Sequence, residues 1–273
     1  MAINRASIAK QLLPGLNAVF GIEYGEVADE YSVLYEVENS DRAFEEEVLF
    51  TGFGTAPTKG EGASVSYDDA QESYTARYTA ETVALALAVT EEAMEDNLYD
   101  TFAKLRARGL ARAMANTKQV KAANIYNNGF SDLIGDGAAF FSASHPTISD
   151  GLQSNLLGAA DLSEATLETA LTAIQKTKDD RGILIGASVV SLHIPVDYWA
   201  VADKILSSPG NTGTSAASAN PNTNAINAIR NMGMVPEGYY INRRFTDTDA
   251  WFVKTDVPNG TKMFVRSPLQ TKM

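Results

Sequence analysis

A long glycine-rich hairpin over residues 50–78 limits what this chain can fold into. The run Val48-Leu49-Phe50 predicts a strand that leads into the tip TGFGTAPTKGEGA. The return strand is predicted to alternate at Val65 and Tyr67 and, after a polar break, at Tyr74, Arg77 and Tyr78. Such a hairpin is polar on both faces and marginally stable by itself, and its edges need a partner. A contact with another subunit is the economical interpretation, and an unattached surface loop is the alternative.

Composition places the chain among soluble globular proteins with a sizeable core. It has 273 residues, of which 45% are hydrophobic and 21% charged, without an apolar run long enough to span a membrane. It has no cysteine, which excludes disulfides, thiolate catalysis and zinc–thiolate sites. A net charge of −12 argues against a protein that mainly grips nucleic acid, although it permits proximity to DNA.

Residues 1–47 are predicted to form an N-terminal arm. A short helix is expected from Ser7 to Leu13, ended by Pro14-Gly15. The apolar residues that follow are interrupted by acidic ones, so the arm cannot bury enough surface to fold alone. Two interpretations stay open, a partly disordered tail and an arm that is ordered by a neighbouring subunit.

The longest helix is predicted over residues 91–128, after a period-two strand over 83–89. Thr90 is its expected N-cap, and the triplet Asn127-Asn128-Gly129 is expected to end it in a left-handed cap. The expected buried stripe is apolar and steps by three or four residues, and it consists of Met94, Leu98, Phe102, Leu105, Leu110 and Met114.

The predicted helix also carries many basic residues for an acidic chain. Among them Arg106, Arg108 and Arg112 are candidates for a surface that faces packaged DNA. A solvated helix face is the alternative interpretation of the same charges.

The second half of the chain is predicted to contain an α/β unit. A helix opens at Ser163-Glu164 and ends near residues 179–182, a buried strand covers 188–194, and a further helix follows Pro195. Residues 207–224 are a low-complexity loop. Short terminal strands are expected around 239–241, 251–253 and 263–265.

The sequence predicts no catalytic, cofactor or metal site. Ser144 and His145 are adjacent, which is a poor arrangement for a nucleophile and its base, and His193 lies in an apolar strand where a hydrogen-bonded core or interface residue is expected. No phosphate-binding glycine motif occurs. The aspartates Asp132, Asp136 and Asp150 fit no calcium-binding pattern. We therefore expect a protein without enzyme activity.

The segment Phe140–Leu156, FFSASHPTISDGLQSNL, resembles a recurring segment of tailed-phage major capsid proteins, especially Mu-like major head subunits. The flanking elements follow the same order from about Phe44 to about Trp251. The chain as a whole resembles a capsid protein of the Hong Kong 97 type, and it is the ordered set of elements, each of low specificity, that carries the resemblance.

This resemblance implies an α+β Hong Kong 97-type capsid fold. Its expected parts are an N-terminal arm at 1–47, an extended E-loop hairpin at 48–80, a peripheral domain at 81–162 with a spine helix at about 91–128, an axial domain at 163–250, and strands at 251–273 that return to the peripheral domain. The E-loop tip, with Pro57, Lys59 and Glu61, would contact another subunit.

The resemblance also implies a function and partners. The protein would self-assemble as hexamers and pentamers into an icosahedral phage head, located in the virion after assembly in the host cytoplasm. Expected partners are packaged double-stranded DNA, held by non-specific contact, and separate scaffold, portal and decoration proteins, with no membrane. No long scaffolding segment precedes the arm, so a separate scaffold, or none, is expected. Lys59 is a candidate for covalent crosslinking, although no acceptor is identified.

Two other functions stay open at this point. One is the shell of an encapsulin-type protein nanocompartment, which shares this fold and encloses protein cargo. The other is a monomeric α/β enzyme with an unrecognised site. The contents of a particle would distinguish the first, and a stable monomer would favour the second.

Overall fold

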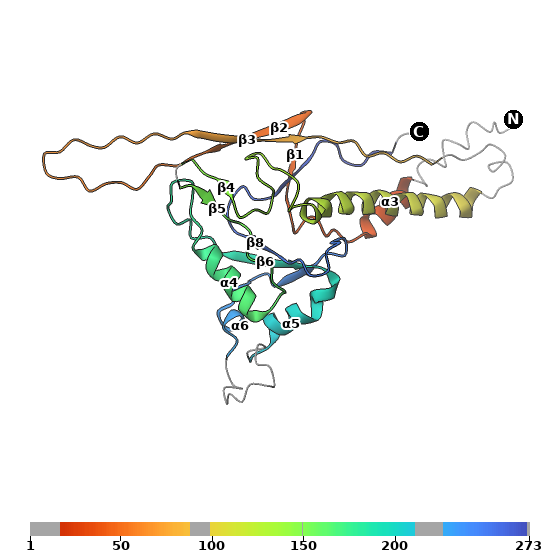
Figure 1. Cartoon of the computed structure of the whole chain (residues 1–273). Helices are drawn as coiled ribbons and strands as arrows, with labels where there is room; N and C mark the ends of the chain where they lie inside the picture. Colours follow the sequence, from red (N-terminus) through yellow and green to blue (C-terminus); the bar gives the residue numbers. More distant parts are fainter. Residues whose placement is uncertain (1–16, 88–98, 149, 211–225, 272–273) are drawn as a thin grey trace.

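The computed structural model describes residues 17–87, 99–148, 150–210 and 226–271, with side chains in the long helix from residue 104 onward. Figure 1 shows a wedge-shaped body beneath two elements that project to opposite sides, a long hairpin and the helix α3.

The chain alternates short strands with helices of varied length. After a helical segment at 17–26, the order is β1 (Glu36–Asn39), β2 (Phe44–Phe50), β3 (Glu72–Thr79), α3 (Tyr99–Asn127), β4 (His145–Pro146), β5 (Leu152–Gln153), α4 (Glu164–Gln175), β6 (Val189–Ile194), the 3-10 turn η1 (Val196–Tyr198), α5 (Trp199–Ser207), α6 (Ala228–Met232), β7 (Tyr239–Ile241), β8 (Phe252–Thr255) and β9 (Lys262–Val265).

A three-stranded sheet organises the narrow part of the wedge. Its order is β7-β6-β8, with β6 parallel to β7 and antiparallel to β8. The central strand β6 is nearly all buried, as predicted, and it includes the buried polar residues Ser191 and His193. Helices α4, α5 and α6 supply the rest of this first core through Leu167, Ile205 and Ile229, each at most 2% exposed.

The predicted signals of this α/β unit are largely confirmed. Ser163 caps α4 by accepting a hydrogen bond from the Thr166 N–H, while the Thr166 hydroxyl accepts one from the Ser163 N–H. Helix α4 ends at Gln175, before the predicted end. Because β8 pairs with β6, this sheet continues past the boundary predicted at residue 250, and only β9 returns to the arm strand β1.

Helix α3 ends at Asn127 as predicted, and its predicted start at Thr90 lies outside the described residues. The expected apolar stripe is contradicted at Leu105, which is 62% exposed, whereas Leu110 and Met114 of the same stripe are partly buried. The buried face instead carries small residues at four-residue steps, Ala107, Ala111 and Ala115, followed by Gln119. Small side chains allow the arm to approach the axis of α3 closely. The size of the side chains, more than their hydrophobicity, therefore determines which face of α3 is buried.

Part of the N-terminal arm folds against its own chain, which neither interpretation of the arm predicted. Gln119 of α3, only 3% exposed, accepts hydrogen bonds from the Glu30 and Tyr31 N–H groups, both at 3.1 Å. The Tyr35 hydroxyl donates to the Ala122 carbonyl of α3 at 2.7 Å. The predicted helix at Ser7–Leu13 lies outside the described residues.

A second core of aromatic rings joins the arm, α3 and the sheet. Tyr126 lies at its centre, with five ring centroids within 6 Å of its own, those of Tyr35, Phe140, Phe141, Phe245 and Phe252. Edge-to-face pairs of this kind stabilise beyond the area that they bury.

The return strand of the hairpin is confirmed from Tyr74 to Tyr78 within β3, but the strand predicted over 83–89 is absent as far as residue 87, where the description stops. Residues 81–87 form no strand in this chain, and Leu85 there is 56% exposed, because no neighbouring strand pairs with the segment. The part of the return strand expected at 65–67 is irregular.

The predicted left-handed cap of α3 is wrong, because Gly129 has no left-handed backbone. A Cβ at Gly129 would lie 2.6 Å from the Phe141 ring, so glycine is required there for close packing.

We predict that Tyr126→Ala lowers the free energy of unfolding by about 3–5 kcal/mol, because it opens a cavity among five rings. Tyr35→Phe, which removes only the buried hydrogen bond to Ala122, should cost about 1 kcal/mol. Denaturant unfolding of both variants checks this. Equal losses for the two variants would contradict a central role for Tyr126.

Candidate assembly surfaces

The hairpin is a two-stranded base with a long irregular end. Strands β2 and β3 pair antiparallel from Phe44 opposite Thr79 to Phe50 opposite Glu72. Residues 51–71 continue away from the body without strand pairing, as Figure 1 shows. The chain reverses near residues 60–63, where the Ala63 N–H donates to the Gly60 carbonyl. A segment of this length with its backbone largely unpaired is open to pairing with another chain.

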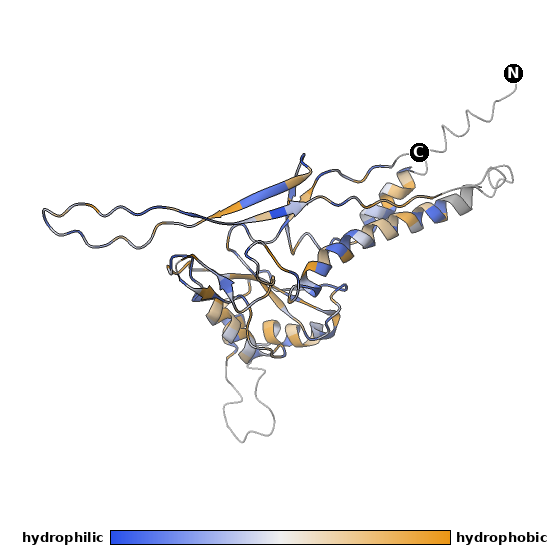
Figure 2. Cartoon of the chain, turned by 45° about the horizontal axis from the view of Figure 1, so that its top comes forward, coloured by the Kyte–Doolittle hydropathy of each residue, from blue (hydrophilic) through white to orange (hydrophobic). Residues whose placement is uncertain are grey.

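The three predicted contact residues, Pro57, Lys59 and Glu61, are all exposed on this projecting end. The same segment exposes large apolar side chains, with Phe53 and Val65 more than 60% exposed and Tyr67 95% exposed. Figure 2 shows hydrophobic positions scattered among hydrophilic ones along the segment. The end of the hairpin therefore offers apolar surface that its own body leaves uncovered.

One ion pair attaches the projecting end to the body. The Arg181 guanidinium donates from Nη2 to both carboxylate oxygens of Asp68, at 2.6 and 2.7 Å. The Gly54 N–H also donates to Asp68, at 2.6 Å. The Gly54 N–H and the Arg181 guanidinium together lower the pKa of Asp68. Both sides of the hairpin are thus tied at this point, and the segment beyond it projects freely.

The base of the hairpin is held more extensively. Lys262 of β9 forms ion pairs with Glu47 of β2 and with Glu38 of β1. The rings of Tyr78 and Phe264 lie 5.0 Å apart. Since these contacts lock β2 and β3 onto the β1–β9 pair, the direction in which the hairpin projects is fixed by its own chain.

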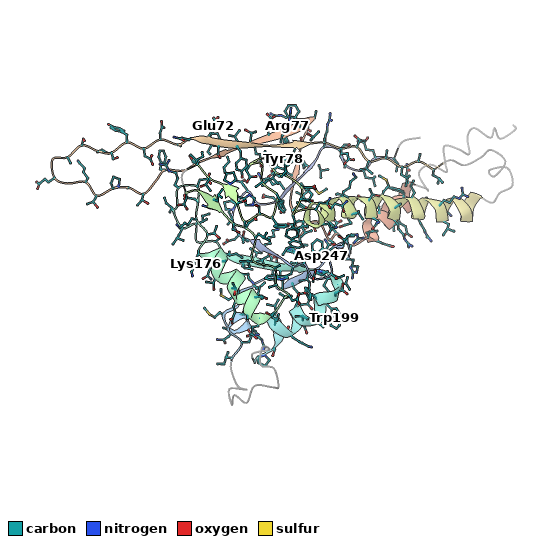
Figure 3. All side chains as sticks on the ribbon, in the orientation of Figure 1. Glu72, Arg77, Tyr78, Lys176, Trp199 and Asp247 are labelled. Carbon is teal, nitrogen blue, oxygen red and sulfur yellow. The ribbon has the colours of Figure 1, made fainter. Side chains whose placement is uncertain are left out.

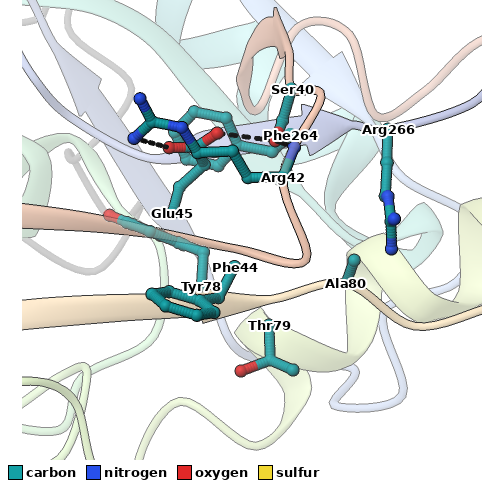
Figure 4. A pocket seen from close by; sticks show the side chains of 9 residues that line it. All are labelled: Ser40, Arg42, Phe44, Glu45, Tyr78, Thr79, Ala80, Phe264 and Arg266. Atoms are coloured by element: carbon teal, nitrogen blue, oxygen red, sulfur yellow. Dashed lines mark hydrogen bonds and ion pairs between the residues drawn. The ribbon is translucent and has the colours of Figure 1, made fainter.

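A hollow of about 220 Å³ lies beside this base. Figure 4 shows it lined by Ser40, Arg42, Phe44, Glu45, Tyr78, Thr79, Ala80, Phe264 and Arg266. Three of its polar side chains already pair with each other, because the Ser40 hydroxyl donates to Glu45 at 2.6 Å and Arg42 lies 3.7 Å from the same carboxylate. The hollow therefore has no set of convergent catalytic groups.

The three arginines predicted to face DNA lie in two different settings in the structure. Arg108 and Arg112, one helical turn apart on α3, both bind the Glu23 carboxylate of the 17–26 helix at 3.1 Å. Glu23 is only 8% exposed, so these pairs hold the arm helix. Arg106 is exposed and lies roughly 200° around the helix from Arg108. Whether any of the three contacts DNA stays a prediction.

Both histidines are held by hydrogen bonds in the interior of the fold. His193 is 2% exposed and its Nε2 lies 3.0 Å from the Ser191 hydroxyl. This Ser–His pair cannot act on a substrate because Ser191 is fully buried. The Nδ1 atom of His145 lies 2.6 Å from the Asp136 carboxylate, and this pair joins the turn after α3 to β4. The expectation for His193 is confirmed.

A different carboxylate fastens the arm to the sheet. Glu30 binds Arg243 at 2.8 Å and Arg244 at 2.7 Å. Burial alone would raise the pKa of Glu30, but hydrogen bonds from Arg244 and Arg243 outweigh it and lower the pKa below its ordinary value. Sequence reasoning missed this cluster and the Asp68–Arg181 pair, since both join residues more than 100 positions apart.

Within the described part of the chain, no group of three acidic or histidine side chains is placed to hold a metal ion. The described helices also include none that is long and apolar enough to cross a membrane.

Comparison with known proteins identifies the class. A family model described as phage capsid protein matches residues 42–272, so the chain belongs to this family of phage capsid proteins. The resemblance to tailed-phage major capsid proteins is confirmed, whereas closeness to Mu-like head subunits stays a prediction. No curated protein matches the sequence.

Solved phage capsids share the fold. The capsid of bacteriophage JBD30 decorated with minor capsid protein trimers is 13% identical, with 81% of this chain and 92% of that chain covered and a TM-score of 0.59. The JBD30 procapsid is 15% identical, with 82% and 98% covered and a TM-score of 0.54. At this identity the likeness is one of fold, and with the family it makes this a structural capsid protein.

We predict that Arg181→Met frees the projecting end of the hairpin without unfolding the body. Amide hydrogen exchange over residues 51–54 and 68–71 should accelerate several-fold, because the bidentate contact to Asp68 is lost. The denaturation midpoint should change little, since the pair attaches a segment that lies outside both hydrophobic cores. Lys59→Ala is the matched control and should leave exchange unchanged.

We predict that His193 makes stability depend on pH. Burial, reinforced by the charge of Lys254, lowers the pKa of His193 to about 4, against 6.5 without the fold. The unfolded chain therefore takes up a proton that the folded chain refuses between these values, and stability falls as pH falls. Relative to His193→Gln, the wild type should lose about 2 kcal/mol between pH 7.5 and pH 5. Parallel curves for the two proteins would contradict this.

Proposed function

We propose that this capsid protein self-assembles as hexamers and pentamers that close into an icosahedral head around double-stranded DNA. The observation that carries the proposal is the hairpin, whose base is fixed to the body while its end exposes Phe53 and Tyr67. Exposed apolar surface on a projecting, unpaired segment is stable in water only when a partner covers it. An adjacent copy of the same chain is the partner that a closed shell supplies.

The finer fold assignment follows from this role. In a Hong Kong 97-type subunit the hairpin over β2 and β3 would be the E-loop and α3 the spine helix of the peripheral domain. The block from α4 to β8 would be the axial domain, with its boundary moved beyond residue 250 to include β8. The E-loop end with Pro57, Lys59 and Glu61 would lie on the peripheral domain of the neighbouring subunit.

Further partners belong to the same proposal. Separate scaffold and portal proteins would act during assembly in the host cytoplasm, and a decoration protein would bind the finished head. One JBD30 capsid of similar fold is decorated with minor capsid protein trimers. For this chain such partners are proposals.

The contents of an assembled particle would distinguish a phage head from the other candidate functions. A head contains nucleic acid, an encapsulin-type shell contains protein cargo, and a monomeric enzyme forms no particle. Electron microscopy of the purified protein, with nuclease treatment and analysis of the contents, separates the three.

We predict that deleting residues 52–70 and closing β2 and β3 with a short Gly-Ser turn abolishes shell formation. The body should still fold, because both cores lie outside the deleted segment. Electron microscopy and a melting curve together check this. Lys59→Ala should assemble nearly as the wild type does, since an exposed ion pair contributes about 0–1 kcal/mol. Intact shells from the deletion variant would overturn the proposed role of the hairpin.

The proposed contact of basic α3 residues with DNA can be separated from their structural role. Arg106→Glu should leave empty shells able to form and reduce stable DNA filling, with an effect that weakens at high salt. Arg108→Gln with Arg112→Gln should also loosen the arm, because Glu23 then remains buried and unpaired. DNA content per particle and arm proteolysis are the readouts. Normal filling in both variants would leave Arg106 on a solvated helix face and would limit Arg108 and Arg112 to holding the arm.

A further inference from the structure

The two flanks of the wedge expose apolar centres beside charged side chains of opposite sign, and on one flank Lys178 also lies 3.8 Å from the Asp150 carboxylate. The first, here the lysine flank, consists of Lys176, Lys178, Ile183, Leu184 and Ile185. The second, here the tryptophan flank, consists of Val196, Asp197, Trp199, Asp203 and Asp247. Figure 3 shows Lys176 on one side of the body and Trp199 and Asp247 on the other.

The lysine flank is a rigid turn that follows α4. Lys178 pairs with Leu184 in an isolated bridge, and the Ile185 N–H donates to the Thr177 carbonyl at 3.0 Å. Gly182 makes the reversal with a φ of 79°, which disfavours other residues. The turn then exposes Leu184 by 62% and Ile185 by 44%. These side chains are held outward by ordered backbone, although the first core lies close behind α4.

The tryptophan flank is built where β6 passes into α5. Helix α5 buries Ala202 and Ile205, so its first residue, Trp199, lies toward the outside and is 55% exposed. Val196 in the preceding turn is 48% exposed. The acidic residues Asp197 and Asp203 are exposed on the same turn and helix.

The exposed Lys176 and Lys178 disfavour contact between two lysine flanks, because Asp179 of the same turn is partly buried and accepts hydrogen bonds from the backbone of that turn. The exposed Asp197 and Asp203 likewise disfavour contact between two tryptophan flanks. The opposite flanks are complementary in both charge and apolar character. A contact between two different surfaces of identical subunits is head-to-tail, and it closes into a ring when the subunits are wedges. Exposed tryptophan is a side chain that often dominates such interfaces.

We infer that the lysine flank of one subunit packs against the tryptophan flank of the next copy around the capsomer. Trp199 and Val196 meet the turn at Ile183–Ile185, with Lys176 and Lys178 facing the aspartates across the rim. This inference rests on the proposed capsid function and specifies the surfaces by which the subunits of one ring recognise each other. The rim charges set direction and register, and the apolar centre supplies most of the affinity.

Cysteine crosslinking tests the inference directly, because the natural chain contains no cysteine. In assembled particles of a Leu184→Cys, Val196→Cys double variant, a short bismaleimide should link subunits into a ladder that ends at pentamers or hexamers. Either single variant alone should give no dimer, and co-assembled single variants should give dimers only. Leu105→Cys combined with Val196→Cys is the matched control, since Leu105 and Leu184 are both 62% exposed.

A charge exchange tests the direction of the contact. Lys176→Glu with Lys178→Glu should reduce assembly at least tenfold in low salt, and so should Asp197→Lys with Asp203→Lys. Combining all four substitutions in one chain should restore assembly, a rescue that damage to folding would not give. Mixing the two double variants should restore hexameric rings, where they can alternate, but not pentameric ones.

The outcomes separate this inference from the proposed function. Particles that form normally without the Leu184–Val196 crosslink, or that tolerate each charge exchange, would overturn the flank contact and leave the capsid function standing. A wild-type chain that stays monomeric at high concentration would overturn both.

Discussion

The rings around Tyr126 are the interaction on which the rest of the structure depends. They come from five separate parts of the chain, the arm at Tyr35, helix α3, the loop at Phe140–Phe141, Phe245 and strand β8 at Phe252. Phe252 also pairs across the sheet with His193 on β6, so the aromatic core is directly connected to the aliphatic core. Each short element is marginal alone and becomes stable through this shared cluster.

These connected cores let the protein carry a hairpin that has no core of its own. The base of the hairpin is tied to β9 through Lys262, and Arg181 ties its midpoint through Asp68. Beyond that point the end of the hairpin is not stabilised by contacts with its own body. In a protein that functions as a monomer, such a segment is usually short or covered by the rest of the chain. In a shell, the neighbouring subunit can cover it. Rigid attachment also reduces the entropy that is lost when the neighbour binds.

The distribution of charge follows the same logic. The chain is acidic overall, yet arginines hold its parts together by pairing with buried or half-buried carboxylates, as Arg108 and Arg112 do with Glu23 and Arg244 does with Glu30. Other charges, such as Lys176 and Asp197 on the two flanks, are exposed and can face another chain. A charge can stabilise the fold or recruit a partner according to which neighbours the fold brings to it.

The sequence alone determined the local elements and the family. The cap at Ser163 and the buried strand before Pro195 are encoded in a few adjacent residues, and the order of the elements sufficed to recognise a phage capsid protein. The start of the hairpin was not predicted correctly, because β2 begins at Phe44 and the strand was predicted from Val48. Only the tertiary structure decided which face of α3 is buried and that the arm folds on its own chain. Periodicity records where side chains point along one element, but not what approaches it. Ala111 is buried and Leu105 exposed because the arm, about 90 residues away in sequence, requires a narrow surface there.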